Sequence, residues 1–175
     1  MREILQKDEP LLREKAQEVD LKKIASSEIK KIIKEMKEAL AIQTDGVAIA
    51  APQIGYPLRI FVVSKKVFDF NEDFKTETEN EDMVFINPEI VSQSKKAELK
   101  EEGCLSCRYL YGKVKRKEKT RVRAYGSDGK IFEYGGSGLM SQIFQHEIDH
   151  LEGVLFIDKA ENLHKIDPED LNLET

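Results

Sequence analysis

The feature that most constrains this chain is the segment QHEIDH at residues 145–150, which holds two of the three histidines in the sequence. On an α-helix, His146 and His150 lie one turn apart along the axis and about 40° apart around it, so both imidazoles reach a common point. Glu147 lies about 100° round from His146, where it can face a water molecule near that point without being a ligand. Because two histidines four residues apart also occur by chance, the pattern alone leaves open a metal site and an ordinary helix.

A metal site on this helix needs a third ligand. Catalytic zinc-type sites usually have three protein ligands and keep the fourth position open for water. Upstream, Cys104 follows a glycine at the end of a predicted strand, and cysteine is a strong, soft ligand once it is deprotonated. Cys104, His146 and His150 therefore form a candidate ligand set with a vacant fourth position.

Two alternatives to this site remain. A small metalloprotease would take its third ligand downstream, where Glu152 and Asp158 are available but stand in no distinctive context. A closed structural zinc site would add Cys107, because CLSC has the Cys-x-x-Cys spacing of zinc half-sites. Against the closed site, a structural metal has no use for Glu147.

An N-terminal amphipathic helix is predicted near residues 28–40. Its start has two candidate caps, Asp20 and the pair Ser26 and Ser27. Charged residues occupy the other face of this helix. The apolar face repeats at helical spacing and comprises Ile29, Ile32, Ile33, Met36 and Leu40.

Strand-like segments occupy the middle of the chain. Five segments have β-branched content or alternating apolar residues, and the last two predict a hairpin joined by the turn SDG. Because the strands cluster before the late helix, the pattern predicts an α+β fold: mixed or antiparallel β-sheets packed around a C-terminal metal-binding helix, with the N-terminal amphipathic helix. The small residues 46–55 are predicted to form a loop. The five strand segments are residues 58–64, 83–93, 96–106, 120–126 and 130–136.

Length and composition predict a single domain over residues 1–175. The net charge of −5 argues against a general polyanion binder. The basic residues 112–123 lack the interleaved aromatic residues that stack on bases, so we interpret them as a solvated face of strands and expect no direct nucleic-acid function. The acidic residues 69–82 lack periodicity and are predicted to form a surface loop.

The apolar runs of the sequence are short. The longest, residues 47–51, is far below the about 20 residues that span a bilayer, so we expect no membrane association. The first ten residues mix both charge signs without an apolar core, unlike a secretory signal. We therefore expect a cytoplasmic protein, in which the two cysteines are thiols or ligands rather than a disulfide.

Three separate stretches resemble the peptide deformylases and occur in the order of that family. They are GVAIAAPQ at residues 46–53, EGCLS at residues 102–106 and QHEIDH at residues 145–150. DEPLLREKA at residues 8–16 also looks like the N-terminal segment of the family. A His-Glu-x-x-His motif alone is moderately specific, whereas the three stretches together at these separations are highly specific.

The resemblance implies a metal centre and a reaction. The metal is physiologically Fe²⁺, with Zn²⁺, Ni²⁺ or Co²⁺ as substitutes in preparations, and it is held by Cys104, His146 and His150. The reaction removes the formyl group from N-formylmethionine at the N-terminus of nascent peptides and releases formate, with Glu147 as the general base. A transient contact with the ribosome is a further expectation.

The family positions also imply donors and a substrate pocket. Gln53 and the backbone N–H of Leu105 would stabilise the developing oxyanion, and small residues would let an extended peptide approach the backbone. For the apolar candidates, plain core packing is the alternative. The candidates for substrate binding are Gly46, Val47, Ala48, Glu102, Gly103, Leu139 and Ile143.

Three residues depart from the family pattern. Ala48 stands where glycine is usual, and alanine fits there only if φ is negative. Tyr111 stands where some members have arginine, and Cys107 stands where an aliphatic residue is common. If CLSC continues a strand, Cys107 points away from Cys104 and behaves as a small apolar residue.

Overall fold

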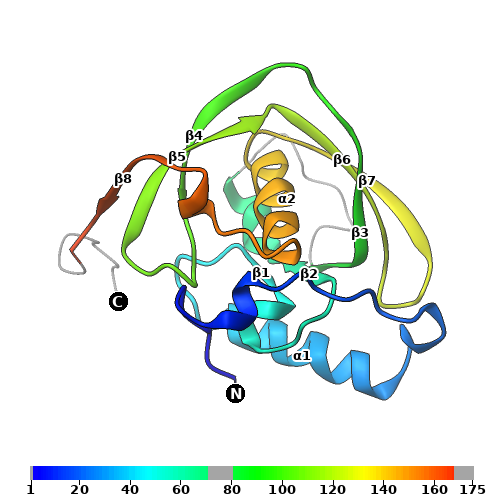
Figure 1. Cartoon of the computed structure of the whole chain (residues 1–175). Coiled ribbons are helices and arrows are strands. Elements are labelled where there is room, and N and C mark those ends of the chain that lie inside the picture. The colour runs from blue at the N-terminus through cyan, green and yellow to red at the C-terminus, as the bar shows by residue number, and fades with distance from the viewer. Residues whose placement is uncertain (1, 71–80, 168–175) are drawn as a thin grey trace.

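The computed structural model describes residues 2–70 and 81–167. Within these residues the chain forms α-helices, short 3₁₀-helices and strands (Figure 1). The 3₁₀-helices are η1 (Pro10–Arg13), η2 (Leu21–Lys23), η3 (Ala51–Ile54), η4 (Lys65–Phe70) and η6 (Phe156–Asp158). The α-helices and strands are α1 (Ser27–Ala41), β1 (Ala48–Ala50), β2 (Ile60–Val63), β3 (Met83–Gln93), β4 (Ala97–Gly103), β5 (Leu110–Lys117), β6 (Lys119–Tyr125), β7 (Ile131–Ser137), α2 (Gly138–Leu151) and β8 (Glu161–Lys165).

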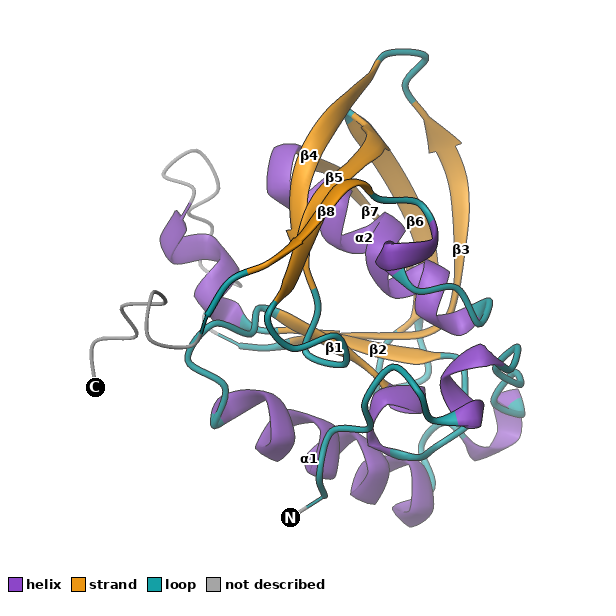
Figure 2. Cartoon of the chain, turned by 60° about the vertical axis from the view of Figure 1, so that its left-hand side comes forward, coloured by secondary structure: helices purple, strands orange, loops and turns teal. Residues whose placement is uncertain are grey.

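The strands form two antiparallel sheets, one of order β1-β2-β3-β6-β7 and one of order β4-β5-β8. Figures 1 and 2 show α2 surrounded by strands of the two sheets, with α1 beyond β1 and β2. A mixed α+β fold with antiparallel sheets is what the sequence predicts. The sequence prediction missed β1, which lies within the expected loop, and β8, which follows α2.

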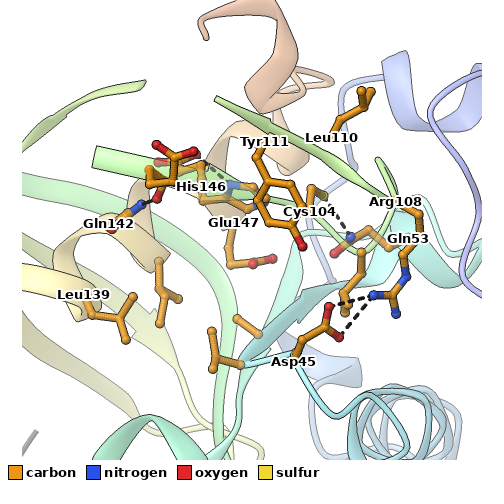
Figure 3. A pocket seen from close by; sticks show the side chains of 18 of the residues that line it. Asp45, Gln53, Cys104, Arg108, Leu110, Tyr111, Leu139, Gln142, His146 and Glu147 are labelled. Carbon is orange, nitrogen blue, oxygen red and sulfur yellow. Dashed lines mark hydrogen bonds and ion pairs between the residues drawn. The ribbon is translucent and has the colours of Figure 1, made fainter. Parts of the chain in front are cut away.

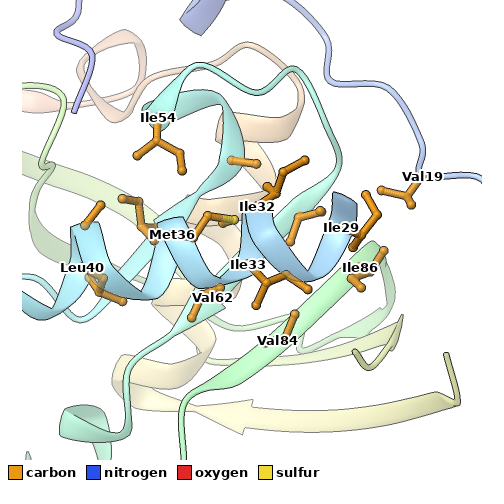
Figure 4. Close-up of a cluster of buried hydrophobic side chains, with 14 of the residues drawn as sticks. Val19, Ile29, Ile32, Ile33, Met36, Leu40, Ile54, Val62, Val84 and Ile86 are labelled. Carbon is orange, nitrogen blue, oxygen red and sulfur yellow. The ribbon is translucent and has the colours of Figure 1, made fainter. Parts of the chain in front are cut away.

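Strand β2 is buried on both faces, because the two α-helices cover opposite sides of its sheet. Ile60 and Val62 belong to the apolar cluster that contains α1. Phe61 and Val63 belong to the cluster that contains α2. The alternation follows the two-residue period of a strand, and Figure 4 shows the α1 residues packed over β2 and β3. The five-stranded sheet is therefore the firmly packed base on which α2 rests.

Both candidate caps of the N-terminal helix are used, but for different helices. The Ser26 hydroxyl accepts a hydrogen bond from the Ile29 N–H at 3.3 Å and caps α1. The Asp20 carboxylate accepts from the Lys22 N–H at 3.0 Å and caps η2. All the apolar residues assigned to the inner face of α1 are buried.

Helix α2 contacts both sheets: β1, β2, β6 and β7 of the larger one and β5 of the smaller one. It ends at Leu151 and is followed by a turn in which Gly153 has a φ of +74°. The Gly153 N–H bonds to the His150 carbonyl at 3.1 Å, and the Val154 N–H bonds to the Asp149 carbonyl at 2.9 Å, which satisfies the last carbonyl groups of the helix. A Cβ on Gly153 would lie 2.5 Å from the Arg13 carbonyl oxygen, so the N-terminal segment packs directly against this turn.

The remaining sequence predictions have mixed outcomes. The predicted hairpin forms from β6 and β7, with Tyr125 paired to Ile131 and Gly129 at a φ of +78° in the turn. Of the predicted acidic loop, residues 69–70 end η4 and residues 71–80 lie outside the described residues. No helix in the described part of the chain is both long and apolar enough to cross a bilayer.

Candidate metal centre

Helix α2 and the end of strand β4 bring three donor atoms together. His146 and His150 lie one turn apart on α2, and Cys104 directly follows β4. One donor atom from each of these residues lies within 4.8 Å of the other two, and Cys104 Sγ is 3.2 Å from His150 Nε2. We call these three residues the donor group. Its nitrogen and sulfur atoms are of the kind that zinc and the neighbouring transition metals bind.

Cys104 opens a turn and does not continue strand β4. The Cys107 N–H donates to the Cys104 carbonyl oxygen at 3.0 Å, so the prediction that CLSC extends the strand is wrong. Neither Leu105 nor Ser106 has a positive φ. A type I turn requires none at its central positions, which is why the segment turns without a glycine.

Cys107 is buried beside the donor group but is not part of it. Its side chain packs with apolar residues that include Leu12, Val114 and Phe156, as a small apolar residue does. It also contacts Cys104: a hydrogen bond between the two thiols, together with burial, raises the pKa of Cys104, and the same bond lowers the pKa of Cys107. The place of Cys107 outside the donor group is what speaks against the closed zinc site, whereas the turn itself is compatible with a Cys-x-x-Cys half-site.

Glu102 connects His146 to a buried arginine. Its Oε2 lies 3.0 Å from His146 Nδ1, and Arg116 donates to its two oxygens at 2.6 and 2.9 Å. With Nδ1 engaged, Nε2 is the nitrogen of His146 that remains free to face the other two residues of the donor group. Burial raises the pKa of Glu102, but the hydrogen bonds from Arg116 and His146 outweigh burial and lower it to about 2.

One sequence interpretation changes at this connection, and one is kept. Arg116 is 4% exposed, so the interpretation of residues 112–123 as a solvated face is wrong at this position. Because both oxygens of Glu102 are engaged, its side-chain stem is what remains to line a substrate pocket. Arg116 also donates to Asp149 Oδ2 at 2.7 Å, which ties strand β5 to helix α2.

The titratable groups of α2 differ in their electrostatics. Burial lowers the pKa of His150 well below its usual range, so its imidazole is neutral and offers a lone pair. Burial also lowers the pKa of His146, but the hydrogen bond with Glu102 and the charge of Glu147 outweigh burial and raise it. Burial raises the pKa of Glu147 to about 7, close to the value that suits a general base near neutral pH.

Two buried polar atoms have no hydrogen-bond partner among the described residues: Glu147 Oε2 and His150 Nδ1. An unpaired buried polar atom costs about 1–3 kcal/mol, so such atoms in a native site indicate an ion, a ligand or water. The neutral imidazole of His150 and the close approach of the three donor atoms agree with that interpretation. The residues present therefore fit a bound metal ion.

Gln53 places its side-chain N–H group beside the candidate metal ligands of the donor group. Its Oε1 accepts from the Ala50 N–H at 2.8 Å, which fixes the orientation of the buried amide. Its Nε2 then lies 3.0 Å from Ser106 Oγ and 3.6 Å from Cys104 Sγ. The predicted role as an oxyanion donor requires an N–H group held in this way.

A pocket of about 260 Å³ opens beside the donor group (Figure 3). His150 is 1% exposed and lies outside the pocket lining. Ala48 has no positive φ, so alanine fits where the family usually has glycine. The other residues that the sequence analysis singled out line the pocket together: Gly46, Val47, Ala48, Gln53, Glu102, Gly103, Cys104, Leu105, Leu139, Ile143, His146 and Glu147.

The sequence analysis missed two features of the pocket. Arg108 donates to the oxygens of Asp45 at 3.1 and 2.8 Å, and Figure 3 shows this pair at one side of the pocket. No local pattern reveals the pair, because its members are 63 residues apart. Tyr111 covers Gly103, since a Cβ there would lie 2.7 Å from its ring; only the pairing of β4 with β5 brings these residues opposite each other.

The downstream alternatives for a third ligand lie elsewhere. Glu152 forms ion pairs with Arg59 at 2.6 Å and with Lys15 at 2.9 Å. Asp158 forms an ion pair with Arg13. Neither carboxylate belongs to the donor group, so the metalloprotease alternative lacks its ligand.

Comparison with known proteins agrees with this geometry. The profile of the family described as polypeptide deformylase matches residues 1–166. A peptide deformylase of Desulforudis audaxviator is 38% identical over 163 residues, which cover 93% of this chain and 96% of the relative. A crystal structure of a peptide deformylase from Legionella pneumophila matches with a TM-score of 0.79 and 37% identity, covering 93% of this chain and 87% of that one. The Thermotoga maritima peptide deformylase matches with a TM-score of 0.78 and 33% identity, covering 92% and 98% of the two chains. This chain therefore belongs to the polypeptide deformylase family.

Proposed function

We propose that this enzyme removes the formyl group from N-formylmethionine at the N-terminus of newly made polypeptides. The observation that carries the proposal is the buried carboxylate of Glu147, which has one oxygen without a partner among the described residues and lines the same pocket as Cys104 and His146. A hydrolase needs such a base close to an electrophilic centre. The products are formate and a free amino terminus.

The donor group is the proposed metal site. Cys104 Sγ, His146 Nε2 and His150 Nε2 would hold the metal, which we propose is physiologically Fe²⁺. When bound, the metal supplies Lewis acidity for attack of water on a carbonyl carbon. Glu102 fixes the ring of His146 through Nδ1, and such outer partners set the orientation of a histidine ligand.

The protein groups then move the proton and stabilise charge. Glu147 Oε2 accepts a proton from the attacking water and afterwards donates it to the leaving amine nitrogen, so that the carbon–nitrogen bond breaks. Gln53 Nε2 and the backbone N–H of Leu105 donate to the oxygen that becomes negative during attack. Because Gln53 is already held by Ala50, its donor needs little reorganisation during the reaction.

The pocket is the proposed binding site for the substrate methionine and the peptide that follows it. Small residues at its rim leave the backbone accessible to an extended peptide. Apolar side chains and the stem of Glu102 surround the space for the methionine side chain. The proposed substrate-binding residues are Gly46, Val47, Ala48, Glu102, Gly103, Leu139 and Ile143.

The substrate class suggests where the enzyme acts. We propose that residues 1–175 form a single deformylase domain that works in the cytoplasm and makes a transient contact with the ribosome. The support for the single domain is that the family profile extends over residues 1–166. The support for the location is that formylated nascent chains emerge at the ribosome.

A formate-release assay with a formyl-Met peptide, run beside metal analysis, tests the proposal. We expect formate to appear in proportion to metal content. An acetyl-Met peptide is the matched control, because it differs by one methyl group at the carbonyl carbon. A folded protein that carries one metal per chain and releases no formate would contradict the proposed function.

A further inference from the structure

The two cysteines of this chain are placed to react with each other. They are the only cysteines in the sequence, and a turn closed by the Cys107 N–H and the Cys104 carbonyl separates them by two residues. The side chain of Cys104 packs against the apolar cluster that contains Cys107. Cys104 lines the pocket and is open to small molecules, whereas Cys107 is 2% exposed and has no part in the donor group.

We propose that Cys107 is a resolving thiol, which captures oxidised Cys104 as an intramolecular disulfide when a peroxide enters the pocket. In the first step, the Cys104 sulfur attacks hydrogen peroxide; an S–O bond forms, the O–O bond breaks and one water leaves, so that the sulfur becomes a sulfenic acid. In the second step, the Cys107 sulfur attacks the Cys104 sulfur. The S–S bond forms, the S–O bond breaks, and hydroxide leaves with the thiol proton as a second water.

The turn supplies the geometry that this reaction needs. The first and last Cα atoms of a β-turn lie less than about 7 Å apart, and disulfides span Cα separations of about 4.4–6.8 Å. No large backbone movement is therefore required. The apolar residues around Cys107 provide no competing partner, and the Ser106 N–H, at 3.4 Å, supports the Cys104 sulfur from within the same turn.

The disulfide changes the outcome of oxidation. A sulfenic acid without a neighbouring thiol is oxidised further to a sulfinic acid, which reductants do not reverse, whereas a disulfide is reversible. Oxidation in this chain therefore removes the sulfur donor from the donor group, and a dithiol reductant restores it. The consequence for activity rests on the proposed function, but formation of the disulfide does not.

Peptide mass analysis tests the proposal without any activity measurement. The full-length protein, stripped of metal with a chelator, is treated with equimolar hydrogen peroxide, then alkylated and digested with trypsin. Cleavage after Lys100 and Arg108 places both cysteines in one peptide, residues 101–108. We expect this peptide to lose two hydrogens and to resist alkylation until a dithiol is added. Nickel-loaded protein treated in the same way should release nickel as the disulfide forms.

The Cys107→Val protein is the matched variant. Its residues 101–108 should accumulate sulfinic acid at Cys104, several-fold more than in the wild type, and it should regain little metal binding after reduction. The wild type should regain nearly all of its metal binding. Both thiols remaining open to alkylation, or sulfinic acid forming as fast in the wild type as in the variant, would overturn the proposal. If the variant does not fold, the mass of the wild-type peptide decides alone.

Discussion

Arg116 and Glu102 are joined inside the protein by two hydrogen bonds, from Nε to Oε1 at 2.6 Å and from Nη2 to Oε2 at 2.9 Å. Their side chains are 4% and 2% exposed. The same arginine bonds to Asp149 on α2, and the same glutamate bonds to His146. The guanidinium of Arg116 therefore holds helix α2 directly and the imidazole ring of His146 through Glu102.

Arg116→Met should destabilise the protein by about 3–5 kcal/mol, because it leaves the buried charge of Glu102 without its main partner. Urea denaturation of the purified protein measures this loss. Arg123→Met is the control, since Arg123 pairs with Glu133 at 2.7 Å but is half exposed, and exposed pairs contribute less than about 1 kcal/mol. Equal losses in the two variants would contradict the structural role of Arg116.

Glu147→Gln should keep its metal and lose turnover by at least about 10²–10⁴-fold. The amide preserves the shape of the side chain but cannot accept a proton from water. Formate release and metal content are measured on the same samples. Glu133→Gln should retain full activity, because Glu133 lies on β7 and does not line the pocket. Near-normal turnover of the Glu147→Gln protein would show that the base lies elsewhere.

Cys104→Ser should lose both metal and activity, whereas Cys107→Val should keep one metal per chain and most of the activity. The reason is that only Cys104 belongs to the donor group, while valine fills the apolar site of Cys107. Metal analysis with circular dichroism as a check of folding makes the comparison. Loss of metal from a folded Cys107→Val protein would return the closed zinc site to consideration.

The iron-loaded protein should lose activity in air, whereas the nickel-loaded protein should keep it. Inactivation in air can proceed by oxidation of the iron or by oxidation of the thiolate that binds it. Replacing iron with nickel removes oxidation of the iron. Samples reconstituted without oxygen and then exposed to air for increasing times give the two decay rates. Identical rates would mean that oxidation at iron does not control inactivation.

Gly153→Ala should destabilise the protein more than Gly129→Ala does. Both glycines have a positive φ, of +74° and +78°, which costs an L-residue about 1–2 kcal/mol. A Cβ added at Gly129 would have open space, because the atom nearest to it lies 4.0 Å away. A Cβ added at Gly153 would lie 2.5 Å from the Arg13 carbonyl oxygen. Denaturation of the two variants isolates the cost of the close contact, and equal losses would count against it.

The elements that the sequence predicted are those whose signals are local. The inner face of α1 and the hairpin of β6 and β7 follow from periodicity within a few residues. Cys104, His146 and Glu147 follow from motifs whose chemistry requires those residue types together. The orientation of Gln53 does not follow in this way, because it depends on the Ala50 N–H and on Ser106 Oγ across the pocket.

Arg116 shows why other parts of the site were missed. Gly112, Val114 and Arg116 alternate with exposed lysines along β5, so the alternation places the arginine inward, but the surrounding basic residues hid that signal. Its partner Glu102 lies on β4, and only the pairing of these strands brings the two together. The CLSC turn was missed because neither of its central residues, Leu105 and Ser106, is a glycine or proline, although Gly103 ends the strand before it.

The donor group draws on both sheets at once: Cys104 follows a strand of the smaller sheet, while His146 and His150 lie on a helix packed against the larger one. A metal bound there would link the smaller sheet to the helix that packs against the larger sheet. The free energy of metal binding at such a site adds to the free energy of folding. Metal binding should therefore protect the packed arrangement of the two sheets against proteases. A partly assembled chain, with its sheets still apart, could not gather the three ligands. The enzyme would thus acquire its reactivity only as the last stage of its own maturation.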